Sequence, residues 1–554
     1  MNATATATAG PAGAVTTPGR APSARRADLT GTGLLVRFAL RRDRVRALVW
    51  VLGIVSLVLV NVPSIKGLYP TQADLDSAAA SFGDNAAARA LNGPAYALDT
   101  LGGQVVFQVG AFGLVVVGLM SLFMVGRLTR GEEESGRTEL IRSMAVGRHA
   151  PAAAALVVVL GMNLVAGALV ALGLVAQGLP VAGSVALGAS YVAFGVFMSA
   201  LTTVAAQVTE NTRVVYGIAG AVVGYAYVVR AAGDAGDGTL SWLSPIGWSQ
   251  KARAFAGEEW WPLLIGPVLA VGLLVLAAEL ASRRDLGGGL VPPRPGPAVA
   301  APSLGSPLGL AVRLQRGSLI GWAIGVLLTG VSYGSIANDV EDLLDDSDAV
   351  EEILARAGGD IVESYLSTTL LVAALIGAGF VVQAALRPRG EEDGRRAEAL
   401  LATPVSRTRW VAGHVAVALA GSLVVLLAGG LGTAVTYGLV ASDLGAVPRL
   451  VGSALAYAPA VWVLVGVAVA LFGLVPRAAP AVWGLLAFCF LVGMLNELLD
   501  LPGWVTALSP FEHVPLLPAA DLDVVPLVAL TAIAAGLIVA GLAGFRRRDL
   551  ASSG

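Results

Sequence analysis

Two stretches of sequence decide the fold: RGEEESGRTELIRSMAVGR at residues 130–148 and RGEEDGRRAEALLATPVSR at residues 389–407. They align without a gap at an offset of 259 residues. Both begin with Arg-Gly-Glu-Glu, both end in arginine, and each follows a long apolar run. Agreement over this length, at corresponding places along the chain, predicts an internal duplication.

Two further repeats support the duplication. Leu-Ser-Pro occurs at residues 243–245 and again at 508–510, and Arg-Arg-Asp-Leu occurs at 283–286 and again at 547–550. In each half these motifs flank the sixth apolar run on either side. We therefore expect each half to contain the same elements in the same order.

The composition predicts a polytopic membrane protein. Of the 554 residues 56% are hydrophobic and only 13% are charged, about half the charged share of a soluble protein. This excludes a disordered chain, and the single cysteine, Cys489, excludes a disulfide scaffold. A net charge of −2 gives no indication of nucleic-acid binding.

Twelve apolar runs are long enough to cross a bilayer as helices. They lie at residues 47–64, 102–126, 152–177, 181–206, 214–230, 262–280, 317–336, 366–386, 410–440, 450–475, 481–498 and 525–544. Six runs per half is an even number, so both halves have the same orientation in the membrane. We predict an all-α fold of twelve transmembrane helices, built as two parallel six-helix repeats.

The predicted organisation has four parts. They are a disordered tail (1–29), a first six-span half (30–284), a linker rich in Pro and Gly (285–309) and a second six-span half (310–550). Residues 30–46 resemble an amphipathic helix on the membrane surface. The linker is expected to contain no helix.

The distribution of basic residues predicts the orientation. With both termini in the cytoplasm, 29 of the 36 Arg and Lys fall on the inside, as the positive-inside rule requires. The N-terminal tail has no apolar stretch of the kind found in signal peptides. We expect a multi-pass protein of a bacterial plasma membrane.

Enzymatic motifs are absent from the sequence or poorly placed. The only lysines, Lys66 and Lys251, lie outside any G-x-x-x-x-G-K-[ST] pattern, so no Walker A loop is present. Residues 330–334 fit G-x-S-x-G, but they lie inside an apolar helix and are better explained by close helix packing, as is the Gly220/Gly224 pair. With three histidines on different segments, no metal site is predicted.

The charged repeats resemble the cytoplasmic coupling segment of type-2 ABC transporter permeases, in which a Glu-rich turn precedes E-L-L-x-x-x-P-V-S-R. Residues 398–407, EALLATPVSR, are close to that pattern, whereas residues 139–148 lack its Pro and Ser. More narrowly, the chain resembles fused, double-length actinobacterial permeases described as exporters of polyketide antibiotics of the tetronasin type. The resemblance covers nearly the whole chain from about residue 30.

The resemblance implies a permease subunit of an ATP-driven exporter of a hydrophobic or amphipathic small molecule. Two copies of a separate ATP-binding subunit would bind ATP and Mg²⁺, and this chain would hold no cofactor. The residues expected to couple it to the ATPase are Glu132, Glu133, Glu134, Glu139 and Arg148, with Glu391, Glu392, Asp393, Glu398 and Arg407 in the second half.

In the family, the first, second and fifth spans of each half face the transport path. Candidate path residues on these spans are Asn61, Gln104, Gln108, Tyr216, Tyr225, Tyr333, Thr368, Thr369, Phe488 and Phe490. Each also has a simpler interpretation, as a residue that bonds or packs one helix against another.

Two other functions remain open at this point. An ion-gradient-driven transporter usually keeps carboxylates within the membrane, but here Glu279, Glu497 and Asp500 lie near the ends of spans, as does His414. A membrane-embedded enzyme or lipid-handling protein would need a polar cluster at one membrane face, and the sequence shows none.

Overall fold

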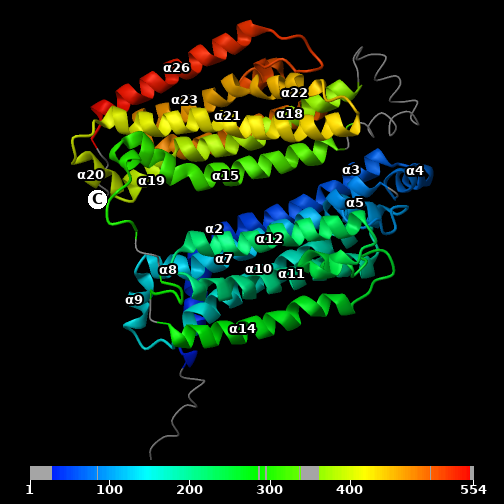
Figure 1. Ribbon diagram of the computed structural model, residues 1–554. Coiled ribbons are helices and arrows are strands. Elements are labelled where there is room, and N and C mark those ends of the chain that lie inside the picture. Colours follow the sequence, from blue (N-terminus) through cyan, green and yellow to red (C-terminus); the bar gives the residue numbers. More distant parts are fainter. Residues whose placement is uncertain are drawn as a thin grey trace, which may run out of the picture. The chain divides into compact units, whose positions relative to one another are not determined.

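The fold of the described residues is entirely helical. The computed structural model describes residues 28–83, 85–284, 287–292, 296–335, 337, 361–499 and 501–549. Every regular element within these ranges is a helix, and twelve of these helical segments are long and apolar enough to cross a membrane (Figure 1). The predicted all-α, twelve-span class is confirmed. The first 27 residues of the predicted tail lie outside the described residues.

The chain divides into two units, Met1–Pro295 and Gly296–Gly554. In the first unit the six spans are α2 (Thr32–Leu59) with α3 (Asn61–Leu68), α6 (Leu101–Val105) with η1 (Val106–Gly110) and α7 (Ala111–Leu128), α10 (Ala150–Ala176), α11 (Val181–Val208), α12 (Thr212–Ala235), and α14 (Ile265–Arg283). The shorter elements are α4 (Gln72–Gly83), α5 (Ala86–Asn92), α8 (Arg130–Glu134), α9 (Arg137–Arg142), η2 (Leu240–Leu243), α13 (Pro245–Gln250) and η3 (Trp261–Leu264).

The second unit repeats this order. Its spans are α15 (Pro307–Gly334), α18 (Ile361–Ala385), α21 (Arg407–Val440), α22 (Ala446–Leu455) with α23 (Ala458–Leu474), η5 (Pro476–Ala481) with α24 (Val482–Leu499), and α26 (Val524–Arg547). The shorter elements are η4 (Pro302–Gly305), α19 (Arg387–Asp393), α20 (Arg396–Leu401), α25 (Gly503–Thr506) and η6 (Pro510–His513).

Two expected boundaries differ from the structure. Within the predicted helix-free linker, η4 forms one short turn and α15 already begins at Pro307, because the Ser306 hydroxyl accepts the Gly309 N–H at 3.0 Å and caps the helix. The predicted surface helix at 30–46 is instead continuous with the first span in α2. No proline interrupts this stretch, so nothing separates the two parts.

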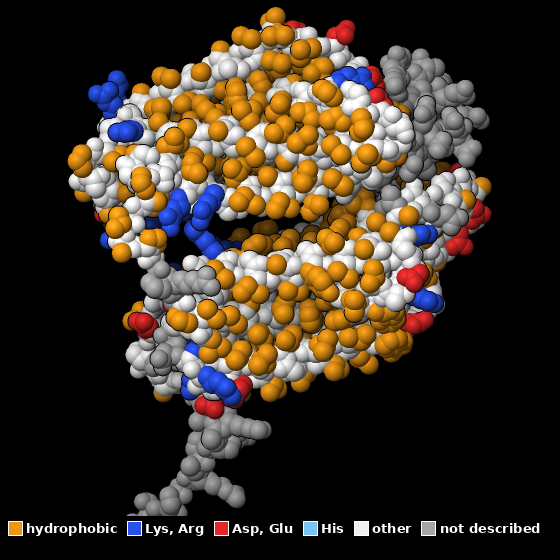
Figure 2. Space-filling model, viewed as in Figure 1, with side chains coloured by type: hydrophobic (Ala, Val, Ile, Leu, Met, Phe, Trp, Pro, Cys, Tyr) orange, Lys and Arg blue, Asp and Glu red, His pale blue; other side chains and the backbone are white. Residues whose placement is uncertain are grey.

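In each unit the second and fourth spans form the interior and the outer spans carry the lipid-compatible surface. In α7, α11, α18 and α23 most side chains are buried, whereas α14, α15 and α26 bury about a fifth of theirs. Figure 2 shows hydrophobic side chains across the visible face of the helices and charged ones near the helix ends. Such a large exposed apolar surface is stable only in a bilayer.

Close helix packing explains the G-x-S-x-G pattern. A Cβ atom at Gly330 would lie 2.3 Å from the Gly429 carbonyl oxygen, and one at Gly334 would lie 2.5 Å from that of Thr433, so α15 touches α21 backbone to backbone. The expected packing role is confirmed there. It is wrong for Gly220 and Gly224, where a Cβ would meet no atom of the described residues within 4 Å.

Candidate functional site: two charged segments that clasp the helix ends

Each charged repeat contains two short helices joined by two residues, the second of which has a left-handed backbone. We call residues 130–148 the first charged segment and residues 389–407 the second. The joint is Gly136 (φ 72°) in the first and Arg395 (φ 55°) in the second, at the same offset of 259. Glycine suits this conformation, whereas an L side chain is disfavoured there. The two segments therefore share one backbone shape despite different sequences.

The first repeated ion pair joins two residues of the same charged segment. Arg137 donates to Glu132 at 3.3 Å, and Arg396 donates to Glu391 at 2.5 Å. The hydrogen bond from Arg396 to Glu391 raises the pKa of Arg396 above its usual range. Each acid has a second arginine partner: Arg42 of α2 for Glu132 at 2.8 Å, and Arg387 of α19 for Glu391 at 2.7 Å.

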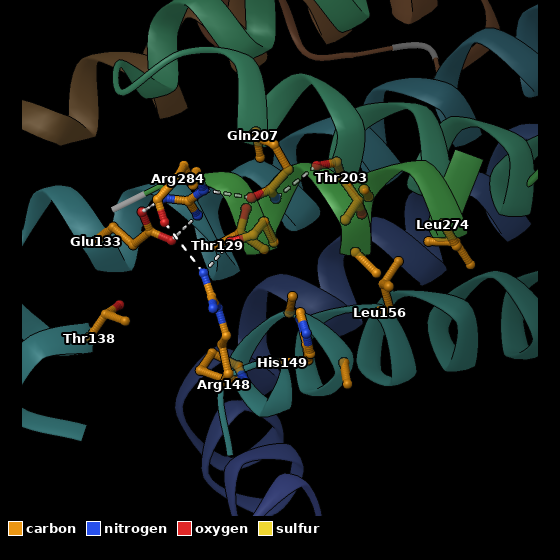
Figure 3. A pocket seen from close by; sticks show the side chains of 17 residues that line it. Thr129, Glu133, Thr138, Arg148, His149, Leu156, Thr203, Gln207, Leu274 and Arg284 are labelled. Carbon is orange, nitrogen blue, oxygen red and sulfur yellow. Dashed lines mark hydrogen bonds and ion pairs between the residues drawn. The ribbon is translucent and has the colours of Figure 1, made fainter. Parts of the chain in front are cut away.

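The second repeated ion pair joins each segment to the end of the sixth span. Glu133 accepts two hydrogen bonds from Arg284, at 2.8 and 3.0 Å, and Glu392 accepts two from Arg548, at 2.7 and 2.6 Å. Figure 3 shows Glu133 and Arg284 facing each other, with Gln207 of α11 bonded to the same guanidinium at 2.7 Å. Two parallel hydrogen bonds between a guanidinium and a carboxylate fix the relative orientation of the two groups as well as their distance.

The side chain of the arginine that ends each segment donates to backbone carbonyl groups at the same helix end. Arg148 donates to the carbonyl oxygens of Ala281 and Ser282, at 2.8 and 2.9 Å. Arg407 donates to that of Arg548 at 2.5 Å. Carbonyl groups in the last turn of a helix have no partner within the helix, so a cation stabilises them there.

The arginine that begins each segment bonds at the end of the fourth span. Arg130 is fully buried and donates to the Ala206 carbonyl near the end of α11, while Arg389 donates to the carbonyl of Pro476, the first residue of η5, where the fourth span ends and the fifth begins. In both units, the charged segment thus clasps the ends of spans four and six. The repeat in the sequence is therefore also a repeat of contacts.

The acids that form these contacts point into their own unit. Glu391 and Glu392 are only 3% and 9% exposed, and the Glu132 and Glu133 side chains are largely covered. Among the ten predicted coupling residues, those with the most exposed placement are Glu134, Glu139, Arg148, Asp393 and Glu398. Their coupling role stays a prediction.

The predicted path residues differ in how exposed they are. Gln104 and Thr369 are buried inside their own units, and Gln104 donates to the Leu98 carbonyl at 2.8 Å. The half-buried positions are Asn61, Gln108, Tyr216 and Phe488, and the exposed ones are Tyr225, Tyr333, Thr368 and Phe490. Their contact with a substrate stays a prediction.

Sequence reasoning missed Arg284 and Arg548, the partners of the second acids. Both belong to the repeated Arg-Arg-Asp-Leu motif, which was a usable signal because a charged motif kept in both halves at a helix end needs a partner nearby. It also missed Asp43, a buried acid of α2 that binds Arg42, Arg46 and Arg127 within 2.9 Å. The sequence gives no repeat that would mark Asp43.

Among the described residues, twelve apolar helices in two units with the same repeated contacts define the class as a multi-pass membrane protein. Residues 304–546 match the family model for the C-terminal domain of the multidrug efflux system permease Rv1217c. The chain is also 43% identical, over 535 residues, to the multidrug efflux system permease protein Rv1217c of Mycobacterium tuberculosis (strain ATCC 25618 / H37Rv), a match that covers 96% of this chain and 97% of that protein.

The chain therefore belongs to the family of permeases that includes this mycobacterial protein. Family membership supports the ABC-type permease class expected from the sequence. The narrower likeness to tetronasin-type exporters stays a prediction.

Proposed function

We propose that the chain is the permease subunit of an ATP-driven ABC exporter that moves a hydrophobic or amphipathic small molecule, a drug or antibiotic, out of the cell. The family relationship supports export, because the mycobacterial relative is named as a multidrug efflux permease. The observation that carries the ATP-driven mechanism is the repeated clasp, in which Glu133 binds Arg284 and Glu392 binds Arg548.

In this proposal, ATP and Mg²⁺ are bound by two copies of a separate ATPase subunit, one beneath each charged segment. Both termini lie in the cytoplasm, on the same side of the plasma membrane as the segments. Closure of the ATPases moves each segment, and the clasp passes that movement to spans four and six. Four or more bonds between charged or carbonyl groups make this connection stiff.

The surface offered to the ATPase is the outer side of α9 and its counterpart α20. Leu140 and Met144 are 72% and 61% exposed in the first segment, next to the exposed carboxylate of Glu139. Glu398 lies at the equivalent position of α20 and is also exposed. Exposed apolar side chains beside a charge suit a protein partner. The buried acids would therefore transmit force, while these exposed residues make the contact.

Transport in sealed vesicles tests the proposal. The chain and its ATPase would be reconstituted in proteoliposomes, and uptake of a fluorescent hydrophobic dye into inside-out vesicles measured with ATP, with a non-hydrolysable analogue, and with an ion gradient alone. We expect accumulation with ATP only. Accumulation driven by the gradient without ATP would instead establish a secondary transporter.

A further inference from the structure

A cavity of about 180 Å³ lies in the first unit, where α10, α11 and α14 meet the first charged segment (Figure 3). α10 and α14 both pack along α11, which forms the floor between them. One wall carries Pro151 and Leu156 of α10, and the facing wall carries Leu274 and Ala281 of α14. The cavity is therefore apolar along the helices.

The end of the cavity at the charged segment has the opposite character. Arg148, Arg284 and Glu133 line it, and because the one carboxylate is paired with Arg284, the two guanidinium groups leave a net positive charge there. This end lies level with the last turn of α14, where a spanning helix reaches the headgroup region. The cavity thus combines a cationic end with an apolar slot along the first turns of α10 and the last turns of α14.

The second unit has the same position, but aromatic side chains fill it. Trp410 stands where the first unit has Pro151, and Phe545 stands where it has Ala281, by the same two offsets that align the repeats. Both rings are buried, with centroids 5.9 Å apart, and the Arg548 guanidinium lies 4.9 Å from the Phe545 ring centre. A depression lined by Thr408, Leu542 and Arg546 remains nearby, but neither ring contributes to its lining.

We propose that the cavity of the first unit binds one anionic phospholipid, with its phosphate at Arg148 and Arg284 and an acyl chain along α10 and α14. The lipid comes from the leaflet on the side of the charged segments, which is the cytoplasmic leaflet in the orientation proposed above. Basic pockets between spanning helices recognise acidic headgroups in this way. A soluble anion would leave the apolar walls wet, and an uncharged apolar molecule would gain nothing from the arginines.

The second unit explains why a ligand is needed in the first. There, Trp410 and Phe545 supply the packing between the third and sixth spans that the bound lipid supplies in the first unit. An unfilled slot of this size would lose packing contacts on every wall. Both halves therefore have the same contacts between the charged segment and the helix ends. They differ in what fills the space between the third and sixth spans, which is protein in the second half and lipid in the first.

Lipid titration of the full-length chain tests this directly. The protein would be purified in detergent, stripped of lipid, and titrated with phosphatidylglycerol, phosphatidylcholine or inorganic phosphate, with bound molecules counted by native mass spectrometry. Ala281→Phe introduces the plug of the second unit. Val275→Phe is the matched control, because this residue of α14 is 66% exposed and does not line the cavity.

We expect one tightly bound phosphatidylglycerol in the unmodified chain and in Val275→Phe. Phosphatidylglycerol should bind the Ala281→Phe variant at least about tenfold more weakly, a difference of about 1.4 kcal/mol. Phosphatidylcholine should bind the unmodified chain more weakly by the same factor. Pro151→Trp tests the same slot if Ala281→Phe does not fold. Equal phosphatidylglycerol binding by a folded plugged variant would overturn the proposal. So would equal binding of the two lipids, or displacement of phosphatidylglycerol by millimolar phosphate.

Discussion

Replacing Glu392 by glutamine should uncouple ATP hydrolysis from transport and lower stability. The carboxylate accepts two hydrogen bonds from Arg548, at 2.6 and 2.7 Å, and both side chains are mostly buried. Removing one member of a buried ion pair costs about 3–5 kcal/mol, because the other charge is left without compensation. We expect the lower end, about 3 kcal/mol, since Arg548 keeps its contacts with Phe472 and Phe545.

The assay compares four versions of the chain by melting temperature in detergent and by ATP hydrolysed per dye molecule transported in proteoliposomes. They are the unmodified chain, Glu392→Gln, the charge swap Glu392→Arg with Arg548→Glu, and Glu279→Gln. Glu279 of α14 is the matched control, because it lies outside both charged segments, its side chain is 56% exposed and it lies 2.8 Å from Arg283. Exposed ion pairs of this kind contribute roughly 0–1 kcal/mol.

We expect Glu392→Gln to melt at a lower temperature and to hydrolyse more ATP per molecule transported. The charge swap should recover part of both losses, and Glu279→Gln should behave as the unmodified chain. Normal coupling and melting of Glu392→Gln would contradict a role for this ion pair. So would a swap variant that is no better than Glu392→Gln alone, because the effect would then not depend on this pair.

Two further predictions concern the exposed face and the helix packing. Reversing the charge of Glu139 and Glu398 together should weaken binding of the ATPase subunit in a pull-down. The melting temperature should not change, because both side chains are exposed. Unaltered binding would show that the ATPase docks elsewhere. Gly330→Ala should destabilise the chain by about 1–3 kcal/mol, because its Cβ would collide with the α21 backbone. Gly321→Ala on the same helix, where a Cβ would meet no atom within 4 Å, should be neutral; equal effects of the two substitutions would contradict the described packing.

The spans and the duplication could be predicted from the sequence because both depend on local patterns. Apolar length decides whether a helix crosses a bilayer, and an ungapped repeat needs only comparison of the chain with itself. The boundaries that differed, at residues 30–46 and at Pro307, depended on single capping or breaking residues. At Pro307 a cap moves the helix start by a few residues, whereas at residues 30–46 the lack of a breaking residue joins the predicted surface helix to the first span.

The direction of the charged side chains could not be predicted in the same way. The sequence predicts that Glu133 and Glu392 contact a partner subunit. In the structure they bind Arg284 and Arg548, which lie 151 and 156 residues further along the same chain. A carboxylate on a short helix suits a partner subunit and an internal arginine equally well. Only the packing of the sixth span against the segment decides between them, and that is tertiary information.

The central claim is that this permease works with a separate ATPase, which moves the charged segments. The most direct test is a mild-detergent purification of the tagged chain from its native host, with mass analysis and an ATP hydrolysis assay of the whole preparation. We expect a soluble ATP-binding subunit at two copies per chain, and ATP hydrolysis that disappears when this subunit is removed. Recovery of the chain alone, without hydrolysis but with gradient-driven transport, would contradict it.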